Sequence, residues 1–177
     1  KSTSIKICGR DLSLLISNND KQGGTIQISS DLLGHGTHVA GTIGANGRIQ
    51  GVAPNAELLS VKVVKKDGLA AIKDIASALE YSAQKGADII NISLGQYGTV
   101  NKKLNQIVTK ITKEYGSIVV VAAGNIGPAL SSTSSPADSK DSISVGAFVS
   151  KEMWEQDFGY LVDKDTMYFF SSRGPNK

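Results

Sequence analysis

Residues 117–122 read Ser-Ile-Val-Val-Val-Ala, and this apolar run restricts the fold more than any other feature of the sequence. A strand that is apolar on both sides is typical of a parallel sheet covered by helices on both faces. Two amphipathic helical patterns precede the run. Residues 72–83 are followed by Gly86, and residues 100–115 are followed by Gly116, a residue that commonly ends helices. The alternation of helices and strands predicts an α/β domain.

Further elements follow from shorter patterns along the chain. A helix rich in small residues is expected over residues 35–44, and a Ser/Thr loop over 131–135. The other expected strands are residues 25–29, 56–64, 87–94, 142–149 and 167–171. Residues 1–24 are polar and without periodicity, which predicts an irregular arm or insert. We therefore expect the partial domain to comprise residues 25–177.

Composition excludes several classes of protein. A length of 177 residues is typical of a single domain. The sequence contains no run of 18 apolar residues, the length that a membrane-spanning helix needs. The single cysteine, Cys8, excludes an internal disulfide framework and a cysteine-based zinc cluster. The net charge is +3 without a dense Lys/Arg stripe, so nucleic acid is not an expected partner. Nucleotide-binding glycine motifs are absent from the sequence, which argues against a nucleotide cofactor.

Three short segments place glycines and polar side chains at the ends of expected elements. They are Gly34-His35-Gly36-Thr37-His38-Val39-Ala40-Gly41, Asn91-Ile92-Ser93-Leu94-Gly95 and Ala122-Ala123-Gly124-Asn125. Open α/β sheets bind ligands beyond the carboxyl ends of their strands. The second and third segments lie at such ends, so we expect a binding site there.

His35 lies at the expected first turn of a helix. The positive end of the helix dipole disfavours an imidazolium ion there, and a neutral imidazole is what a general base requires. Gly34 and Gly36 leave room for a substrate beside the ring. The alternative is a histidine that caps or packs at a helix start, and position alone favours this alternative. A metal site shared with His38 is a weaker reading, because zinc-binding helices usually space two histidines by four residues.

Asn125 follows an apolar strand and Gly124. A carboxamide that projects beyond a strand end can donate a hydrogen bond to an oxyanion during acyl transfer. The alternative is an ordinary turn asparagine, which the position alone would favour. The backbone of Ser93 and Gly95 can pair with an extended peptide as an added strand, with a plain strand-to-loop transition as its alternative.

Together these segments resemble the subtilisin-like serine proteases, the subtilases. Residues 34–41 look like the family's histidine motif, and residues 122–125 look like its oxyanion segment. The remaining matches, in the order found in the family, are Gly51-Val52-Ala53-Pro54, Ser93-Leu94-Gly95 and Phe170-Ser171-Ser172-Arg173-Gly174-Pro175. An insertion at residues 150–170, rich in aromatic side chains, looks like the branch of pyrolysin and tripeptidyl-peptidase II.

The resemblance implies a truncated, subtilisin-like three-layer domain with a mainly parallel sheet and helices on both faces. It implies a serine endopeptidase with a Ser-His-Asp triad, in which His35 is the general base. Asn125 would be the oxyanion donor. Ser93, Leu94, Gly95 and Gly124 would bind the substrate.

Two motifs of the family are absent from the sequence. They are the Asp-Ser/Thr-Gly motif of the triad acid and the Gly-Thr-Ser-Met-Ala motif of the nucleophile. Asp11 and Asp20 lack the context of the triad acid. Asp31 lacks it too, although it matches an acidic position often found just before the histidine motif. We therefore expect the core of a longer protease, inactive by itself. The alternative is a protease-like domain that binds extended peptides without cutting them.

The resemblance implies catalysis without a cofactor. Residues 45–50 are shorter than the loop that binds calcium in many subtilisins, so the sequence does not support a calcium site. The expected partners are a polypeptide substrate, the remaining parts of the parent protease and, through uncovered apolar surface, a second copy of the chain. Neither nucleic acid nor a membrane is expected. The branch favours a location outside the cell, with the cytosol as the alternative.

Overall fold

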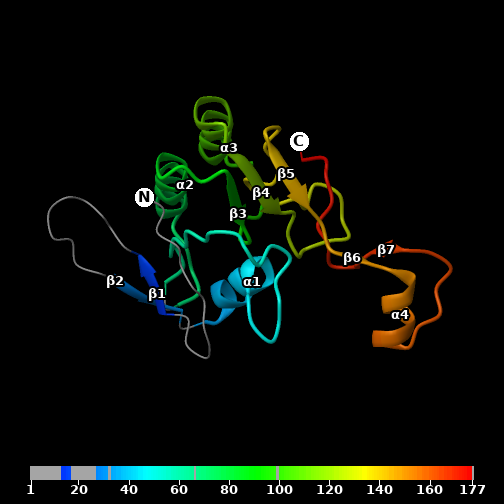
Figure 1. Cartoon of the computed structure of the whole chain (residues 1–177). Coiled ribbons are helices and arrows are strands. Elements are labelled where there is room, and N and C mark those ends of the chain that lie inside the picture. The colour runs from blue at the N-terminus through cyan, green and yellow to red at the C-terminus, as the bar shows by residue number, and fades with distance from the viewer. Residues whose placement is uncertain (1–12, 17–26, 32, 66, 99, 177) are drawn as a thin grey trace, which may run out of the picture. The chain divides into compact units, whose positions relative to one another are not determined.

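The computed structural model describes residues 13–16, 27–31, 33–65, 67–98 and 100–176 (Figure 1). The chain divides into two compact units, Lys1–Ala78 and Leu79–Lys177. Helix α2 (Ile72–Gln84) crosses the boundary between them. Each unit is described by itself.

The first unit contains an antiparallel strand pair and one complete helix. β1 (Ser13–Ile16) pairs with β2 (Gln27–Ser30), and α1 (His35–Gly44) follows. The predicted helix over residues 35–44 is confirmed. β2 overlaps the strand expected at 25–29, of which residues 25 and 26 lie outside the described residues.

β1 lies within the stretch expected to be irregular. Its strand geometry depends on pairing with β2, with Ile16 opposite Gln27, and a partner some distance along the chain is not visible in a local pattern. The rest of residues 1–24 lies outside the described residues. The predicted boundary at residue 25 stays a prediction.

The strand expected at residues 56–64 is wrong. This segment belongs to no described β-ladder, and none of its apolar side chains is fully buried, with Leu59 39% exposed. A strand satisfies its backbone groups through a neighbouring strand. The apolar, β-branched pattern indicates an extended chain but cannot show whether such a neighbour exists.

A three-stranded parallel sheet organises the second unit. Its strands are β3 (Ile89–Ile92), β4 (Ile118–Ala122) and β5 (Ser142–Val145), in that order across the sheet (Figure 1). Ile92 is paired with Val121, and Val121 with Ser144. The prediction of a parallel sheet is confirmed, and the carboxyl ends of the three strands lie at one edge.

The helices between β3 and β4 supply the centre of the core. Helix α3 (Lys102–Lys110) continues into the π-turn η1 (Ile111–Tyr115). Leu104, Val108 and Ile111 recur at helical spacing and are fully buried. The helix begins where the Asn101 side chain accepts a hydrogen bond from the Leu104 N–H at 3.1 Å. It ends at Gly116, whose φ of 73° suits glycine.

The two faces of the sheet differ in burial. One face carries Ile90, Ile92, Val119 and Val121, all buried in the core. The opposite face is also apolar but open, with Ile89 64%, Ile118 48% and Ile143 54% exposed. This second apolar face accounts for the continuous hydrophobic run that the sequence shows in β4.

The strand expected at residues 142–149 is interrupted. β5 ends at Val145, and β6 (Phe148–Val149) belongs to a separate antiparallel pair. Gly146 lies at the break, where a Cβ atom would collide with the Met167 side chain and lie 2.9 Å from the Ser171 hydroxyl. Close passage of the chain therefore interrupts the strand.

The strand expected at residues 167–171 is mostly wrong. Only β7 (Thr166–Met167) forms a strand, paired with β6. The Ser171 N–H then donates to the Tyr168 carbonyl at 2.9 Å and closes a turn. Aromatic side chains favour strands, but here the turn directs them into a cluster of rings.

Helix α4 (Lys151–Phe158) was not expected from the sequence. It begins where the Ser150 hydroxyl accepts a hydrogen bond from the Met153 N–H at 3.2 Å, and it ends at Gly159, with φ of 72°. These are ordinary start and stop signals. None of its residues is buried, so no continuous apolar stripe marks the helix.

Replacing Leu104 by alanine should destabilise the chain by about 2–5 kcal/mol, because a fully buried leucine leaves a cavity. Urea unfolding followed by far-UV circular dichroism measures the change. Leu161→Ala is the control, since Leu161 is 84% exposed and its loss should cost at most about 0.5 kcal/mol. Equal unfolding midpoints for the two variants would contradict the core described here.

Candidate active site

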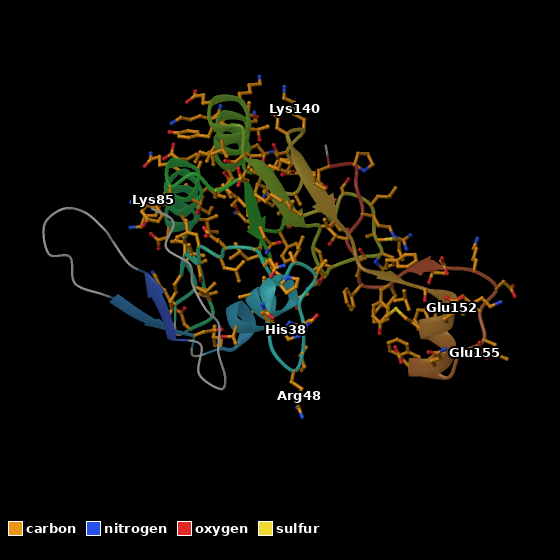
Figure 2. All side chains as sticks on the ribbon, in the orientation of Figure 1. His38, Arg48, Lys85, Lys140, Glu152 and Glu155 are labelled. Atoms are coloured by element: carbon orange, nitrogen blue, oxygen red, sulfur yellow. The ribbon has the colours of Figure 1, made fainter. Side chains whose placement is uncertain are left out.

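His35 is the first residue of α1, and its side chain is exposed. The preceding Gly34 has φ of 76° and ψ of −13°, a left-handed conformation that glycine adopts without strain. The Gly34 carbonyl accepts the N–H of His38, which lies on the same helix (Figure 2), at 2.9 Å. The imidazole of His35 is thus presented at a helix start on a turn of defined geometry.

Asp31 fixes the turn that precedes His35. Its carboxylate accepts hydrogen bonds from the backbone N–H groups of Leu33 at 3.1 Å and Gly34 at 3.0 Å. It also accepts the backbone N–H and the hydroxyl of Thr37, both at 2.8 Å. The hydrogen bond from the Thr37 backbone, with smaller contributions from the other donors, holds the pKa of this carboxyl below its ordinary value of 3.8. The ionised carboxylate therefore stabilises the hydrogen-bonded turn at the start of α1.

In the second unit, the ends of β3 and β4 bring together the other predicted site residues. Ser93, Leu94 and Gly95 follow β3, while Gly124 and Asn125 follow β4 shortly after it. Because the strands are parallel neighbours, both segments leave the sheet at the same edge. This is the edge at which ligands bind in sheets of this kind.

The segment after β3 is joined to the loop that follows β4. Gln96 and Ser135 exchange two backbone hydrogen bonds, at 2.9 and 2.8 Å. The Ser134 N–H donates to the Ala123 carbonyl at 2.9 Å. A Cβ atom on Gly95 would collide with the Ser134 side chain, so only glycine fits at this point.

Tyr97 and Ser172 hold the turn that carries Asn125. The Asn125 N–H donates to the Tyr97 hydroxyl at 2.9 Å. The Ser172 hydroxyl accepts the Ile126 N–H at 3.2 Å, and the Ser172 N–H donates to the Gly124 carbonyl at 2.9 Å. With its backbone held in this way, Asn125 has an exposed side chain.

Gly124 has no space for a side chain. Its φ is 116°, and a Cβ atom would lie 2.6 Å from the Tyr97 ring and 2.7 Å from the Ser172 hydroxyl. Sequence reasoning placed Ser172 in a family motif but gave it no role, and it missed Tyr97. No local signal points to Tyr97, because it acts on a residue 28 positions away.

The structure describes His35 in the first unit, and it describes Ser93, Leu94, Gly95, Gly124 and Asn125 in the second. It brings the five residues of the second unit to one sheet edge. Their assigned roles, and that of His35, stay predictions. Within the described residues, no three side chains of the types His, Cys, Asp and Glu cluster to hold a metal. No helix in the same part of the chain is long and apolar enough to cross a bilayer.

Comparison with known proteins agrees with the resemblance. A model of the Subtilase family (Peptidase_S8) matches residues 7–177. Pyrolysin of Pyrococcus furiosus is 29% identical over 214 residues, which cover 93% of this chain and 15% of pyrolysin. Subtilisin BL of Lederbergia lenta is 45% identical over 117 residues, which cover 64% of this chain and 42% of that protein.

A solved structure of an S41 psychrophilic protease is 31% identical to the chain, with a TM-score of 0.71. The match covers 89% of this chain and 51% of that one. The predicted subtilisin-like α/β fold is confirmed. The chain spans well under two thirds of the length of these relatives.

Replacing Asp31 by asparagine should destabilise the chain by about 1 kcal/mol near neutral pH, because the NH2 group of the carboxamide cannot accept the hydrogen bonds that one carboxylate oxygen receives from Thr37. Because the pKa of Asp31 in the folded chain lies below 3.8, its stabilisation is complete above that value. The stabilisation is lost as the pH falls through the lower, folded-state pKa. Urea unfolding at several pH values should therefore show that the free energies of unfolding of the wild type and of Asp31→Asn become equal in acid.

Asp163→Asn is the matched control, because Asp163 is exposed and its replacement should change stability little at any pH. A stability difference between wild type and Asp31→Asn that stays constant into strong acid would refute the role given to the carboxylate.

Proposed function

Because the chain belongs to the subtilase family, with residues 7–177 matching it, we propose that it is the central part of a serine endopeptidase. The parent protein would hydrolyse peptide bonds with a Ser-His-Asp triad. The observation that carries this proposal is the shared edge of β3 and β4, where Ser93, Leu94 and Gly95 lie beside the turn of Asn125. A peptide bound along the first segment would pass the second.

His35 would act as the general base. It would take the proton of the nucleophilic serine hydroxyl as the oxygen attacks the carbonyl carbon, and it would return the proton to the leaving amine. Its exposed position at the start of α1 supports this role. The bonds of Asp31 to the turn before it support a fixed orientation of the helix start.

Asn125 would stabilise the tetrahedral intermediate. Its carboxamide would donate a hydrogen bond to the oxyanion, a contribution of roughly 3–4 kcal/mol in such sites. The support for this role is the backbone of the turn, which Tyr97 and Ser172 hold while the Asn125 side chain stays exposed. A donor fixed before the reaction needs no reorganisation when the charge develops.

The substrate would lie as an extended strand along the backbone of Ser93, Leu94 and Gly95, with Gly124 completing the wall of the site. The proposed chemistry uses no cofactor, and residues 45–50 support no calcium site. The family's polypeptide substrates and the rest of the parent protease are the proposed partners. The branch resemblance favours action outside the cell, and an export signal in the complete reading frame would support it.

A protease-like domain that binds extended peptides without cutting them is the second candidate, because the backbone of Ser93 and Gly95 could pair with a peptide without any nucleophile. A serine-directed fluorophosphonate separates the two candidates. Labelling of the full-length parent supports the endopeptidase. An unlabelled parent that still binds extended peptides supports the binding domain.

In the full-length parent, Asn125→Leu should lower kcat by about 10²–10³-fold with little change in KM, because the donor acts on the transition state. His35→Ala should reduce activity further, since the base would be lost. Steady-state kinetics with a fluorogenic peptide measures both effects. Asn55→Leu, at another exposed asparagine, should leave kcat unchanged; a wild-type kcat in Asn125→Leu would exclude the oxyanion role.

The isolated chain should self-associate through the open face of its sheet, where Ile89, Ile118 and Ile143 are 48–64% exposed. Size-exclusion chromatography over a range of concentrations measures this, and Ile118→Lys should shift the equilibrium toward monomer. A clean monomer at high concentration would contradict the expectation.

A further inference from the structure

An open groove of about 900 Å³ lies in the second unit, between the loop after Asn125 and the segment that contains α4 and β7. Pro128, Trp154, Met167 and Phe169 supply its apolar lining. Phe169 is 65% exposed and Met167 43%, so large apolar groups face solvent. Ligand sites in proteins are lined mainly by apolar and aromatic side chains with a few polar groups, which is the composition of this lining.

Packing among aromatic rings makes one wall of the groove rigid. The Trp154 ring stacks on Tyr168 with the ring centroids 5.5 Å apart and an interplanar angle of 12°. Phe158 packs against Trp154 at 5.0 Å. The Trp154 indole N–H donates to the Thr166 hydroxyl at 2.8 Å, which fixes the ring relative to β7. A preformed wall lowers the entropic cost of binding.

Hydrogen bonds tie the groove to the turn that carries Asn125. The Gly127 N–H donates to the Phe170 carbonyl at 2.7 Å, next to the bond between Ile126 and Ser172. Pro128 follows Asn125 by three residues, so the chain between them spans at most about 11 Å. An extended peptide advances about 3.3 Å per residue. The groove therefore lies within about three substrate residues of the Asn125 turn.

The charged rim of the groove favours an anion. Lys164 and Arg173 lie along it, and neither belongs to an ion pair within the part of the chain that the structure describes. Asp165 also lines the groove, but its carboxylate accepts the Lys151 backbone N–H at 2.8 Å. Among the residues that line the groove, two cations therefore stand against one hydrogen-bonded carboxylate.

We propose that this groove binds a segment of the polypeptide substrate within about three residues of the scissile bond, with a large apolar side chain next to an acidic one. The apolar side chain lies against Met167 and Phe169, and the carboxylate lies near Lys164 and Arg173. This proposal rests on the proposed endopeptidase function, because only that function makes the bound peptide a substrate. The groove itself can be tested without activity.

The chain contains a single tryptophan, Trp154, which lines the groove and so reports binding directly. The probes are three short peptides that lack Trp and Tyr and differ only at two positions, Phe-Glu, Phe-Gln and Ala-Glu. Titration of the 177-residue chain with the Phe-Glu peptide should change Trp154 emission in a saturable way. The other two peptides should bind roughly fivefold more weakly, because each lacks one half of the contact.

Lys164→Glu should weaken binding of the Phe-Glu peptide by about fivefold or more and leave the Phe-Gln peptide nearly unchanged. Lys140→Glu is the matched control: Figure 2 shows Lys140 well away from α4, which carries Glu152 and Glu155. Lys164 is exposed, so its substitution should not disturb folding. Equal affinity for the three peptides, or no saturable change in emission, would overturn the groove as a peptide site.

The same peptides, extended across a cleavable bond, test use of the groove by the full-length parent. The proposal expects kcat/KM to be about fivefold higher for the Phe-Glu substrate and to lose this preference in Lys164→Glu. An active parent without the preference would overturn the inference and leave the proposed function standing. A parent that cleaves none of the substrates, with peptide binding at Trp154 intact, would overturn the function and leave the groove standing.

Discussion

The parallel pairing of β3 with β4, with Ile92 beside Val121, is the constraint on which the candidate site depends. Parallel neighbours end at the same edge, so two segments separated by about thirty residues in sequence leave the sheet side by side. The buried faces of both strands and the apolar side of α3 make this register costly to change, because a slip of one residue would turn apolar groups outward. The core thus determines where Ser93 and Asn125 lie.

Backbone hydrogen bonds then set the local geometry of the proposed site residues. Tyr97 binds the N–H of Asn125, and Asp31 binds the turn before His35. In the first place the side chain holds the main chain of the proposed site residue itself, and in the second it holds the main chain on either side of it. The side chains of Asn125 and His35 are both exposed beside these hydrogen bonds, an arrangement that suits the preorganised catalysis proposed here.

The sequence predicted the features that local patterns encode. Helical periodicity located α2 and α3, and apolar runs located the central strands, because burial imposes these periods on the sequence. The helix α1 was predicted from its run of small residues after a turn. Residues 56–64 show the limit of predicting strands from a local pattern, because an extended pattern does not show whether a partner strand exists. The residues that cap α4, Ser150 and Gly159, are visible in the sequence. They did not predict a helix, because no stripe of buried apolar residues lies between them. The role of Tyr97 could not be predicted from local sequence, because Asn125, whose N–H it binds, lies 28 residues away.

The central proposal is that Asn125 donates a hydrogen bond to the oxyanion that forms on a peptide bound along Ser93, Leu94 and Gly95. A crystal structure of the complete protease with a peptidyl boronate, which mimics the tetrahedral intermediate, measures this directly. One boronate oxygen is expected within about 2.7–3.1 Å of Asn125 Nδ2, with the peptide extended along Ser93, Leu94 and Gly95. A bound boronate whose oxygens all lie beyond hydrogen-bond distance of Asn125 Nδ2 would contradict the proposal.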